Sequence, residues 1–159
     1  MKRILFVCLG NICRSPAAEE ILRWQAARRG LSGEVTVDSA GTYGGHRGEK
    51  ADFRMRAAAS NRGYTLTHRS RKVESDDFGR FDMLIAMDDS NYESLYRLAP
   101  SVEASRRIYR MREFFSEPCR WDHVPDPYYE GAEGFELVLD LLERACGNLL
   151  DRIEGGVPE

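Results

Sequence analysis

Near the start of the chain, two cysteines, an arginine and a serine fall within eight consecutive residues, in the run Cys8-Leu9-Gly10-Asn11-Ile12-Cys13-Arg14-Ser15. A cysteine thiolate is a strong nucleophile, and the planar guanidinium of an arginine can bind two phosphoryl oxygens at once. The spacing of Cys8 and Arg14, with five residues between them, therefore suggests a site for an anion with several oxygens, phosphate above all.

The segments on either side of this run are expected to be a strand and a helix. Residues 2–7 are largely apolar and β-prone, which suits a strand buried on both faces. Ser15 and Pro16 are a typical helix start, a hydroxyl N-cap followed by proline. Gly10 and Asn11 can adopt the left-handed backbone angles of a tight loop. Such a loop turns its amides inward at the positive end of a helix dipole, where they bind an anion and favour a thiolate.

A second Cys-x5-Arg pair shows that the spacing alone proves little. Cys146 and Arg152 have the same spacing, but they lie in an expected amphipathic helix, where residues six apart face different ways. Neither a preceding strand nor a helix-capping serine accompanies them. We therefore interpret the N-terminal pair as functional and Cys146 as a packing residue.

The rest of the chain alternates strand-like and helix-like stretches without a repeat or a linker. This alternation predicts an α/β protein of three layers, with a parallel sheet between helices and ligands at the carboxyl ends of its strands. Cys8 falls at such an end. The expected strands are 2–7, 35–37, 81–87 and 107–109, and the expected helices are 16–29, 52–61, 90–98 and 135–153, the last with an apolar stripe for the core.

The composition is that of an ordinary globular protein, and we expect one domain over residues 1–159. A net charge of −3 argues against general nucleic-acid binding. No apolar run approaches membrane-spanning length, and the N-terminus lacks the features of a signal peptide. Four cysteines without a secretion signal suggest a reducing cytoplasm. Because no further Cys/His pairs accompany the N-terminal cysteines, we expect neither a metal nor a cofactor.

Phosphoryl transfer through a cysteine also needs an acid that protonates the departing oxygen, and Asp126 is the candidate. Pro125 and Pro127 restrict the backbone on both sides of it, so its carboxyl group is held on a defined loop. An ordinary Asp-Pro turn would explain the same pattern. Tyr128 and Tyr129 favour the functional interpretation, because their rings could form one wall of a slot for an aromatic substrate.

Taken together, residues 8–16 and 126–129 resemble the low-molecular-weight protein tyrosine phosphatase family. Three further segments resemble signatures of that family in the family's order: 38–42, 68–71 and 81–88. The resemblance implies a flavodoxin-like fold with a sheet of four parallel strands and a metal-independent, two-step hydrolysis of phosphotyrosine.

By the same resemblance, Cys8 would attack the phosphorus and form a phosphocysteine, and Arg14 would bind the phosphoryl group. Asp126 would protonate the leaving phenol and then activate water. Each role agrees with the chemistry of the residue. The phosphate and the substrate ring would be bound by the loop and by the tyrosines that follow the acid: Leu9, Gly10, Asn11, Ile12, Cys13, Ser15, Tyr128 and Tyr129.

Supporting roles follow from the same source. Ser15 would hydrogen-bond the thiolate, and Asn11 would hold the loop with Ser39 and His68 as partners, although His68 could equally be a satisfied surface histidine. The resemblance suggests a reversible disulfide between Cys13 and Cys8 that protects the nucleophile from over-oxidation; simple packing is the alternative. Asp88 matches a structural acid near the site, and a turn or helix cap explains it equally well.

The chain departs from the family at Gly45. Members often have a tryptophan or tyrosine six residues after the serine matched by Ser39, where it forms the opposite wall of the substrate slot. Here that wall is either open, with weaker stacking on the substrate ring, or built by Tyr43 or His46. An open wall predicts that Gly45→Trp lowers KM for phosphotyrosine peptides.

Three other functions need weighing. A thioredoxin-coupled arsenate reductase would need a further cysteine pair, and residues 87–90 contain none. A protein-arginine phosphatase is closer, but such enzymes typically have threonine at the position of Ile12, whose apolar side chain favours an aromatic ester. A non-catalytic phosphotyrosine-binding module would need neither the thiol nor the acid.

The expected partner is a phosphotyrosine-containing protein, with an autophosphorylating tyrosine kinase as one possibility, and neither nucleic acid nor a membrane. We expect a cytoplasmic monomer or weak dimer.

Overall fold

A computed structural model describes residues 1–116, 119–128 and 130–155. Its strands form one parallel sheet in the order β2-β1-β3-β4. Because β1 lies between β2 and β3, the chain moves outward in opposite directions from β1, which is the arrangement of flavodoxin-like folds. The predicted four-stranded parallel sheet is confirmed, and its strands are β1 (Lys2–Cys8), β2 (Val35–Gly41), β3 (Met83–Ala86) and β4 (Ile108–Arg110).

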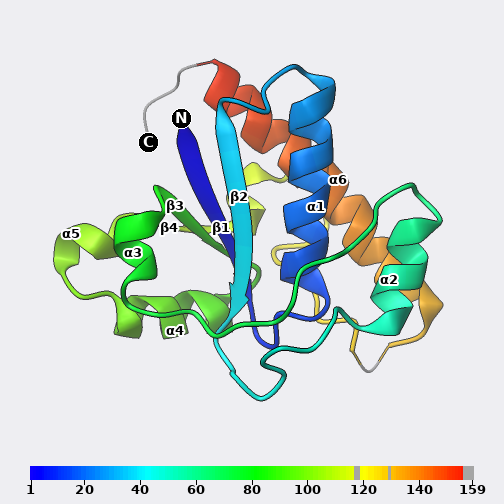
Figure 1. The fold of residues 1–159 in the computed structure, drawn as a ribbon, viewed down its shortest axis with the longest axis horizontal. Coiled ribbons are helices and arrows are strands. Elements are labelled where there is room, and N and C mark those ends of the chain that lie inside the picture. Colours follow the sequence, from blue (N-terminus) through cyan, green and yellow to red (C-terminus); the bar gives the residue numbers. More distant parts are fainter. Residues whose placement is uncertain (117–118, 129, 156–159) are drawn as a thin grey trace.

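Helices cover both faces of this sheet, so the predicted three layers are confirmed (Figure 1). One face carries α1 (Arg14–Arg28) and α6 (Ala132–Glu154), with α2 (Phe53–Ser60) packed beside α6. The other face carries α3 (Asp77–Arg80), α4 (Asp89–Leu98) and α5 (Val102–Ser105). A 3-10 turn, η1 (Met111–Phe114), follows β4.

Successive side chains of β1 point alternately into the two hydrophobic clusters on either side of the sheet. Ile4 and Phe6 pack with the cluster under α1 and α6, whereas Leu5 and Val7 pack with the cluster on the α4 side. All four side chains are fully buried. A strand with helices on both faces has no polar side, and this is why the sequence shows a continuous apolar run.

Several element boundaries differ from the prediction for tertiary reasons. Helix α1 begins at Arg14, two residues before the predicted start, and its N-cap is Cys13 without a side-chain capping bond. The predicted N-cap role of Ser15 is therefore wrong: its hydroxyl lies in a buried polar network instead. Strand β2 continues to Gly41, beyond the predicted end at residue 37, because residues 38–41 pair with β1.

The apolar stripe of α6 packs in the core as predicted, and Cys146 lies on it, fully buried, with its sulfur near the carbonyl oxygen of Ala18. Its role in packing is confirmed. Within the described ranges, no helix has both the length and the apolar character needed to cross a membrane.

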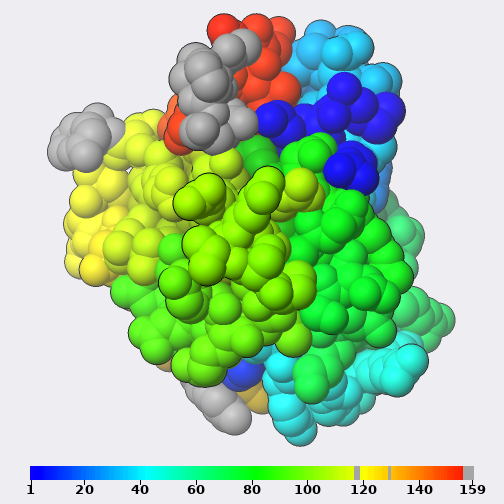
Figure 2. All heavy atoms as spheres, turned by 90° about the vertical axis from the view of Figure 1, so that its left-hand side faces the viewer, coloured from blue at the N-terminus to red at the C-terminus, as the bar shows by residue number. Residues whose placement is uncertain are grey.

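The carboxyl ends of β1 and β2 lie at the lower edge of the molecule in Figure 1, and the loops that follow them meet there. Figure 2 shows the face formed mainly by α3, α4 and α5, and the loop after β2 projects at the lower edge of this view (cyan). The loop that begins with Leu9 is therefore positioned at the edge where a doubly wound sheet places its ligands.

Candidate active site

The loop between β1 and α1 uses its carbonyl groups for protein contacts. The carbonyl oxygens of residues 8, 9, 10 and 12 accept hydrogen bonds from the Thr42 amide at 2.9 Å, the Tyr43 amide at 2.8 Å, the Ser70 hydroxyl at 3.0 Å and the Asp52 amide at 2.7 Å, respectively. No hydrogen bond joins the amides of residues 9–13 to another group in the described part of the chain. These amides are therefore left for an external acceptor, as an anion site at a helix start requires.

Asn11 holds this loop in an unusual conformation. Its φ of 57° lies in the left-handed region, where it is the one non-glycine residue among those described. Its amide nitrogen donates to Ser15 Oγ at 2.8 Å and Ser39 Oγ at 3.1 Å, and its oxygen lies 2.9 Å from His68 Nε2. Three side chains, two of them from distant parts of the chain, thus meet around one strained residue.

Gly10 serves a different purpose from the one predicted. It does not adopt left-handed backbone angles. A Cβ at this position would lie 3.1 Å from the His46 ring, a tight contact, so the absence of a side chain gives the ring room beside the loop.

Cys8 lies at the floor of the loop, with only 2% of its surface exposed. Its sulfur is 3.0 Å from the hydroxyl oxygen of Ser15. Since that hydroxyl already accepts from Asn11, its own proton is free to point toward the sulfur, because the alternative acceptor, the Ala40 carbonyl, is 3.4 Å away. A hydroxyl donor at this distance stabilises a thiolate.

The Arg14 guanidinium is buried and held along one edge. Nη1 donates to Asp88 Oδ2 at 2.8 Å and to the Val124 carbonyl oxygen at 2.9 Å, while Nη2 lies 3.7 Å from Asp126. Burial by itself would lower the pKa of Arg14, but the charges of Cys8, Asp88 and Asp126 raise it overall. The group therefore stays cationic.

Asp88 has both of the roles that the sequence left open. One of its carboxylate oxygens accepts from the Asn91 amide and caps α4, and the other holds Arg14. The Val124 carbonyl contact left no signal in the sequence, because any residue type could supply it.

Asp126 lies at the mouth of the site, with its side chain 41% exposed and its carboxylate facing Arg14. It also accepts from the Tyr128 amide at 3.0 Å, which is the hydrogen bond of an Asp-Pro turn. Asp126 therefore both forms an Asp-Pro turn and lies beside the loop after β1, so the two interpretations of this residue are compatible. The Tyr128 ring packs under the Arg54 guanidinium, 5.3 Å from the ring centroid. Tyr129 lies outside the described residues.

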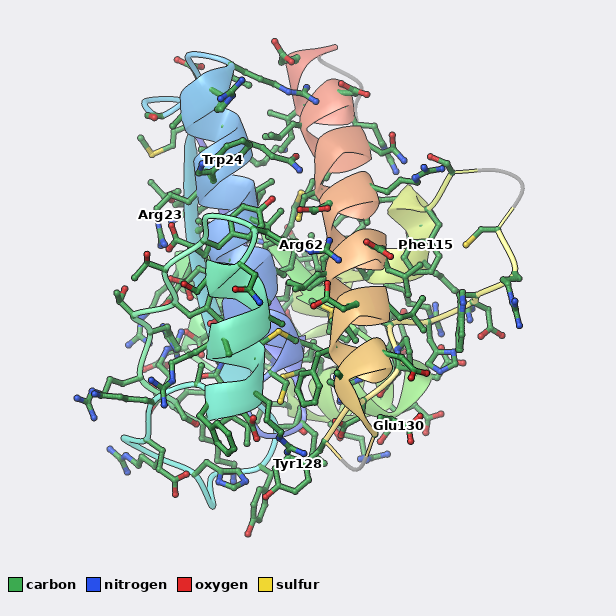
Figure 3. The ribbon with its side chains drawn as sticks, turned by 90° about the vertical axis from the view of Figure 1, so that its right-hand side faces the viewer. Arg23, Trp24, Arg62, Phe115, Tyr128 and Glu130 are labelled. Atoms are coloured by element: carbon green, nitrogen blue, oxygen red, sulfur yellow. The ribbon has the colours of Figure 1, made fainter. Side chains whose placement is uncertain are left out.

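Together these groups line a pocket of about 300 Å³. The thiol lies at its floor, and three aromatic rings lie at its mouth, where Tyr128 marks the lower edge of the molecule (Figure 3). The His46 ring stands 6.0 Å from the Tyr43 ring and 6.4 Å from the Tyr128 ring, measured between centroids. The lining residues are Cys8, Leu9, Gly10, Ile12, Cys13, Arg14, Tyr43, His46, Asp126 and Tyr128.

The wall opposite Tyr128 is therefore built by Tyr43 and His46. A Cβ on Gly45 would overlap the phenol end of Tyr43, so the ring of Tyr43 occupies the space that an aromatic side chain at residue 45 would take. Of the two possibilities for this wall, the closed one agrees with the structure.

A pair of substitutions tests this wall. Tyr43→Ala removes one aromatic contact, worth about 1 kcal/mol, and should raise KM for phosphotyrosine peptides about fivefold with little change in kcat. Gly45→Trp should also raise KM, because the indole and Tyr43 compete for one space. A lower KM for Gly45→Trp, with a silent Tyr43→Ala, would mean that the wall is open in solution.

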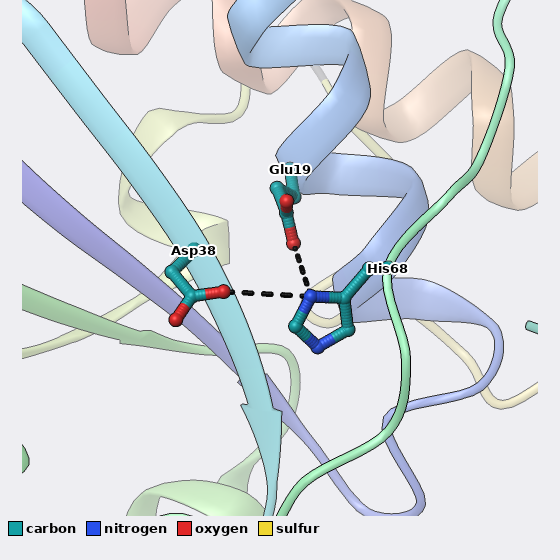
Figure 4. Close-up of side chains that lie close together, drawn as sticks. All are labelled: Glu19, Asp38 and His68. Carbon is teal, nitrogen blue, oxygen red and sulfur yellow. Dashed lines mark ion pairs between the residues drawn. The ribbon is translucent and has the colours of Figure 1, made fainter. Parts of the chain in front are cut away.

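Behind the loop, His68 faces two carboxylates, shown in Figure 4. Its Nδ1 lies 3.2 Å from Glu19 Oε1 and 3.4 Å from Asp38 Oδ1. These are ligand types that bind cations, but the carboxylates already accept from other groups: Glu19 from Ser39 and Arg23, and Asp38 from Arg71. The cluster is a hydrogen-bonded support for Asn11. Sequence reasoning placed Ser39 and His68 here and missed Glu19, which carries no local signal.

Cys13 lines the same pocket as Cys8, and both thiols are free and buried. Burial raises the pKa of Cys13, so this residue is a neutral thiol. The reversible disulfide between the two cysteines stays a prediction.

A parallel sheet of this order, followed by a loop with a buried thiol, amides without a protein partner and a buried arginine, defines a class of small α/β phosphatases. The sequence from residue 3 to 158 matches the family described as low molecular weight phosphotyrosine protein phosphatase, and the chain belongs to that family of hydrolases. A putative low molecular weight protein-tyrosine-phosphatase of Synechocystis is 45% identical over 93% of this chain and 94% of its own.

Solved structures agree. A protein tyrosine phosphatase from Entamoeba histolytica, with Hepes in its active site, is 44% identical and has a TM-score of 0.94, over 98% of this chain and 99% of its own. A drosophila arginine phosphatase is 30% identical, with a TM-score of 0.88 over 96% and 97% of the two chains.

Proposed function

We propose that this protein hydrolyses phosphotyrosine in protein substrates through a phosphocysteine at Cys8. The observation that carries the proposal is the convergence, in one pocket, of a buried thiol, an oriented guanidinium and a carboxylate at the mouth. Relatives that match 93% and 98% of this chain are named as a putative protein-tyrosine-phosphatase and a protein tyrosine phosphatase, which supports the same reaction.

In the first step, the Cys8 sulfur forms a bond to phosphorus as the bond to the phenol oxygen breaks. Arg14 and the free amides of the loop stabilise the equatorial oxygens in the transition state. Asp126 gives its proton to the departing oxygen. In the second step, Asp126 takes a proton from water, which attacks phosphorus and displaces the sulfur.

The pocket also favours an aromatic ester. Cys8 lies below three rings, so a phosphoryl group must be carried on a stem long enough to reach the floor. The ring of phosphotyrosine provides that length and can stack between Tyr43 and Tyr128, whereas the stem of phosphoserine is too short.

The direct test compares peptides that carry phosphotyrosine, phosphoserine or phosphoarginine. We expect turnover of the phosphotyrosine peptide far above the other two, and a burst of p-nitrophenol from p-nitrophenyl phosphate. Preference for phosphoarginine would favour a second candidate function, that of an arginine phosphatase. This candidate is based on the similarity to the drosophila arginine phosphatase. The apolar side chain of Ile12 in the pocket argues against this candidate, because it favours an aromatic ester over a polar guanidine. Binding without turnover would indicate a phosphotyrosine-binding module.

Asp126→Asn tests the acid. We expect aryl phosphate hydrolysis to slow by about 10²–10⁴-fold, the usual contribution of a positioned proton donor. The loss should be larger for phenyl phosphate than for p-nitrophenyl phosphate, whose leaving group needs less help from a proton. Asp122→Asn, at an exposed residue of the same segment, is the matched control and should behave as the wild type. An equal loss of activity on both substrates would mean that Asp126 only stabilises its turn and does not act as the acid.

Three finer assignments are part of the proposal. The substrate would be an autophosphorylating tyrosine kinase or another phosphotyrosine protein, the location cytoplasmic, and the oligomeric state a monomer or weak dimer. The family's action on phosphotyrosine proteins supports the first of these in its general form.

A further inference from the structure

A second hollow opens beside the catalytic pocket. It has a volume of about 650 Å³ and is lined by His46, residues 49–54 and Arg56, together with Ile12 and Tyr128. Ile12, His46 and Tyr128 line both hollows, so the two share a wall. A peptide whose phosphotyrosine enters the pocket can therefore place its neighbouring residues in this groove.

The groove carries uncompensated positive charge. Three cationic side chains, Lys50, Arg54 and Arg56, line it against two carboxylates. Both carboxylates have partners inside the groove: Glu49 lies 3.1 Å from His46 Nδ1, and Asp52 accepts two hydrogen bonds from the Arg54 side chain, at 3.0 and 2.9 Å. Lys50 and Arg56 have no carboxylate partner within the described ranges, and Arg56 donates only to the Ala51 carbonyl oxygen. Two cations are therefore available to an anionic ligand.

This local charge belongs to a wider asymmetry of the chain. Residues 42–72 contain eight lysines and arginines but only two acidic residues, although the whole chain has a net charge of −3. The first part of this segment is the loop that projects from the surface in Figure 2. A basic patch at the mouth of a pocket steers acidic partners toward it and discriminates against basic ones.

The groove also contains an exposed apolar side chain. Phe53 is 70% exposed and borders both this groove and another hollow of about 530 Å³, between α2 and the first turn of α6. An exposed phenylalanine in the first turn of a surface helix is an anchor for an apolar side chain of a partner.

From these observations, which rest on the function proposed above, we propose that the groove selects the sequence around the phosphotyrosine. The preferred substrate is a peptide segment with acidic side chains next to the phosphotyrosine, which pair with Lys50 and Arg56, and an apolar residue further along, which packs on Phe53. The proposed substrate class is therefore proteins in which acidic residues flank the phosphotyrosine.

The test compares two phosphotyrosine peptides that differ only in their flanks, one with glutamates on both sides and one with glutamines. We expect wild-type protein to have a KM about tenfold lower for the acidic peptide, with the difference shrinking in high salt because exposed charges are screened. In Lys50→Glu/Arg56→Glu, the preference should disappear or reverse. Arg47→Glu, in the same loop but outside the groove lining, is the matched control and should keep it.

Each outcome either supports the groove assignment or contradicts it. The double variant could have a lower melting temperature because Arg56 has lost its hydrogen bond to the Ala51 carbonyl oxygen. In that case Lys50→Glu alone, at an exposed side chain, should still reduce the preference for the acidic peptide severalfold. Wild-type turnover without any flank preference would overturn the groove assignment and leave the proposed function intact. No turnover of p-nitrophenyl phosphate would overturn the proposed function itself. An unchanged preference in the double variant, with loss of binding to phosphatidylserine vesicles, would assign the patch to a membrane surface instead.

Discussion

Cys8→Ser is expected to reduce turnover by at least about 10⁴-fold, while phosphate binds to the variant nearly as well as to the wild type. The serine hydroxyl is not ionised at neutral pH and cannot replace the thiolate as nucleophile. The phosphate contacts come from the loop amides and Arg14, which the substitution leaves in place. The measurement is initial rate with p-nitrophenyl phosphate, together with titration of phosphate by calorimetry.

Cys146→Ser is the control for this variant, because both thiols are buried and each stands six residues before an arginine. Cys146 packs between α6 and α1, far along the chain from the phosphate loop. We expect normal kinetics for this variant, with some loss of thermal stability. Appreciable activity in Cys8→Ser would refute the phosphocysteine mechanism.

Arg14→Lys should reduce kcat/KM by about 10³-fold or more, although it keeps the positive charge. A transition state with charge on three equatorial oxygens needs donors in one plane, and an ammonium group supplies a point charge instead. The structure adds a second reason. One guanidinium nitrogen holds both Asp88 and the Val124 carbonyl, and a lysine that kept those two contacts would have only one N–H left for phosphate.

Arg152→Lys is the matched control, since the Arg152 guanidinium stacks over Phe114 and takes no part in the pocket. It should leave kcat/KM unchanged. If Arg14→Lys also kept most of its activity, with phosphate affinity as in the wild type, the bidentate clamp would be wrong and the loop amides alone would carry the phosphoryl group.

The wall of the substrate slot shows where sequence comparison is weakest. From the residue types, the absence of an aromatic residue at position 45 indicated either an open slot or a substitute wall. Only the folded loop shows that the phenol of Tyr43 fills the space beside Gly45 and that the centroid of the His46 ring lies 6.0 Å from that of Tyr43 and 6.4 Å from that of Tyr128. A long side chain can reach the same place from a different backbone position, so spacing along the chain does not decide which residue forms a surface.

The same limit explains the elements that were missed. Helices α3 and α5 and the turn η1 have only four residues each. Segments so short gain little from helix propensity, and their conformation depends on tertiary contacts such as those of the buried Asp77 carboxylate with Arg71.

What the sequence determined by itself is local. A continuous apolar run, a Cys-x5-Arg loop and a helix directly after it are contiguous, so their chemistry and order could be inferred from residue types and from the periodicity of the chain. The tertiary structure decided what depends on distant partners. It gave Asn11 its left-handed conformation, added Glu19 to the support behind it, and held Arg14 by Asp88 and the Val124 carbonyl. The contacts of Asn11 with Ser39 and His68, and of Ser15 with the Cys8 sulfur, were expected from the family resemblance and not from local patterns. Hydrogen bonds between residues far apart in the chain exist only once the fold brings them together, and no pattern of neighbours specifies them.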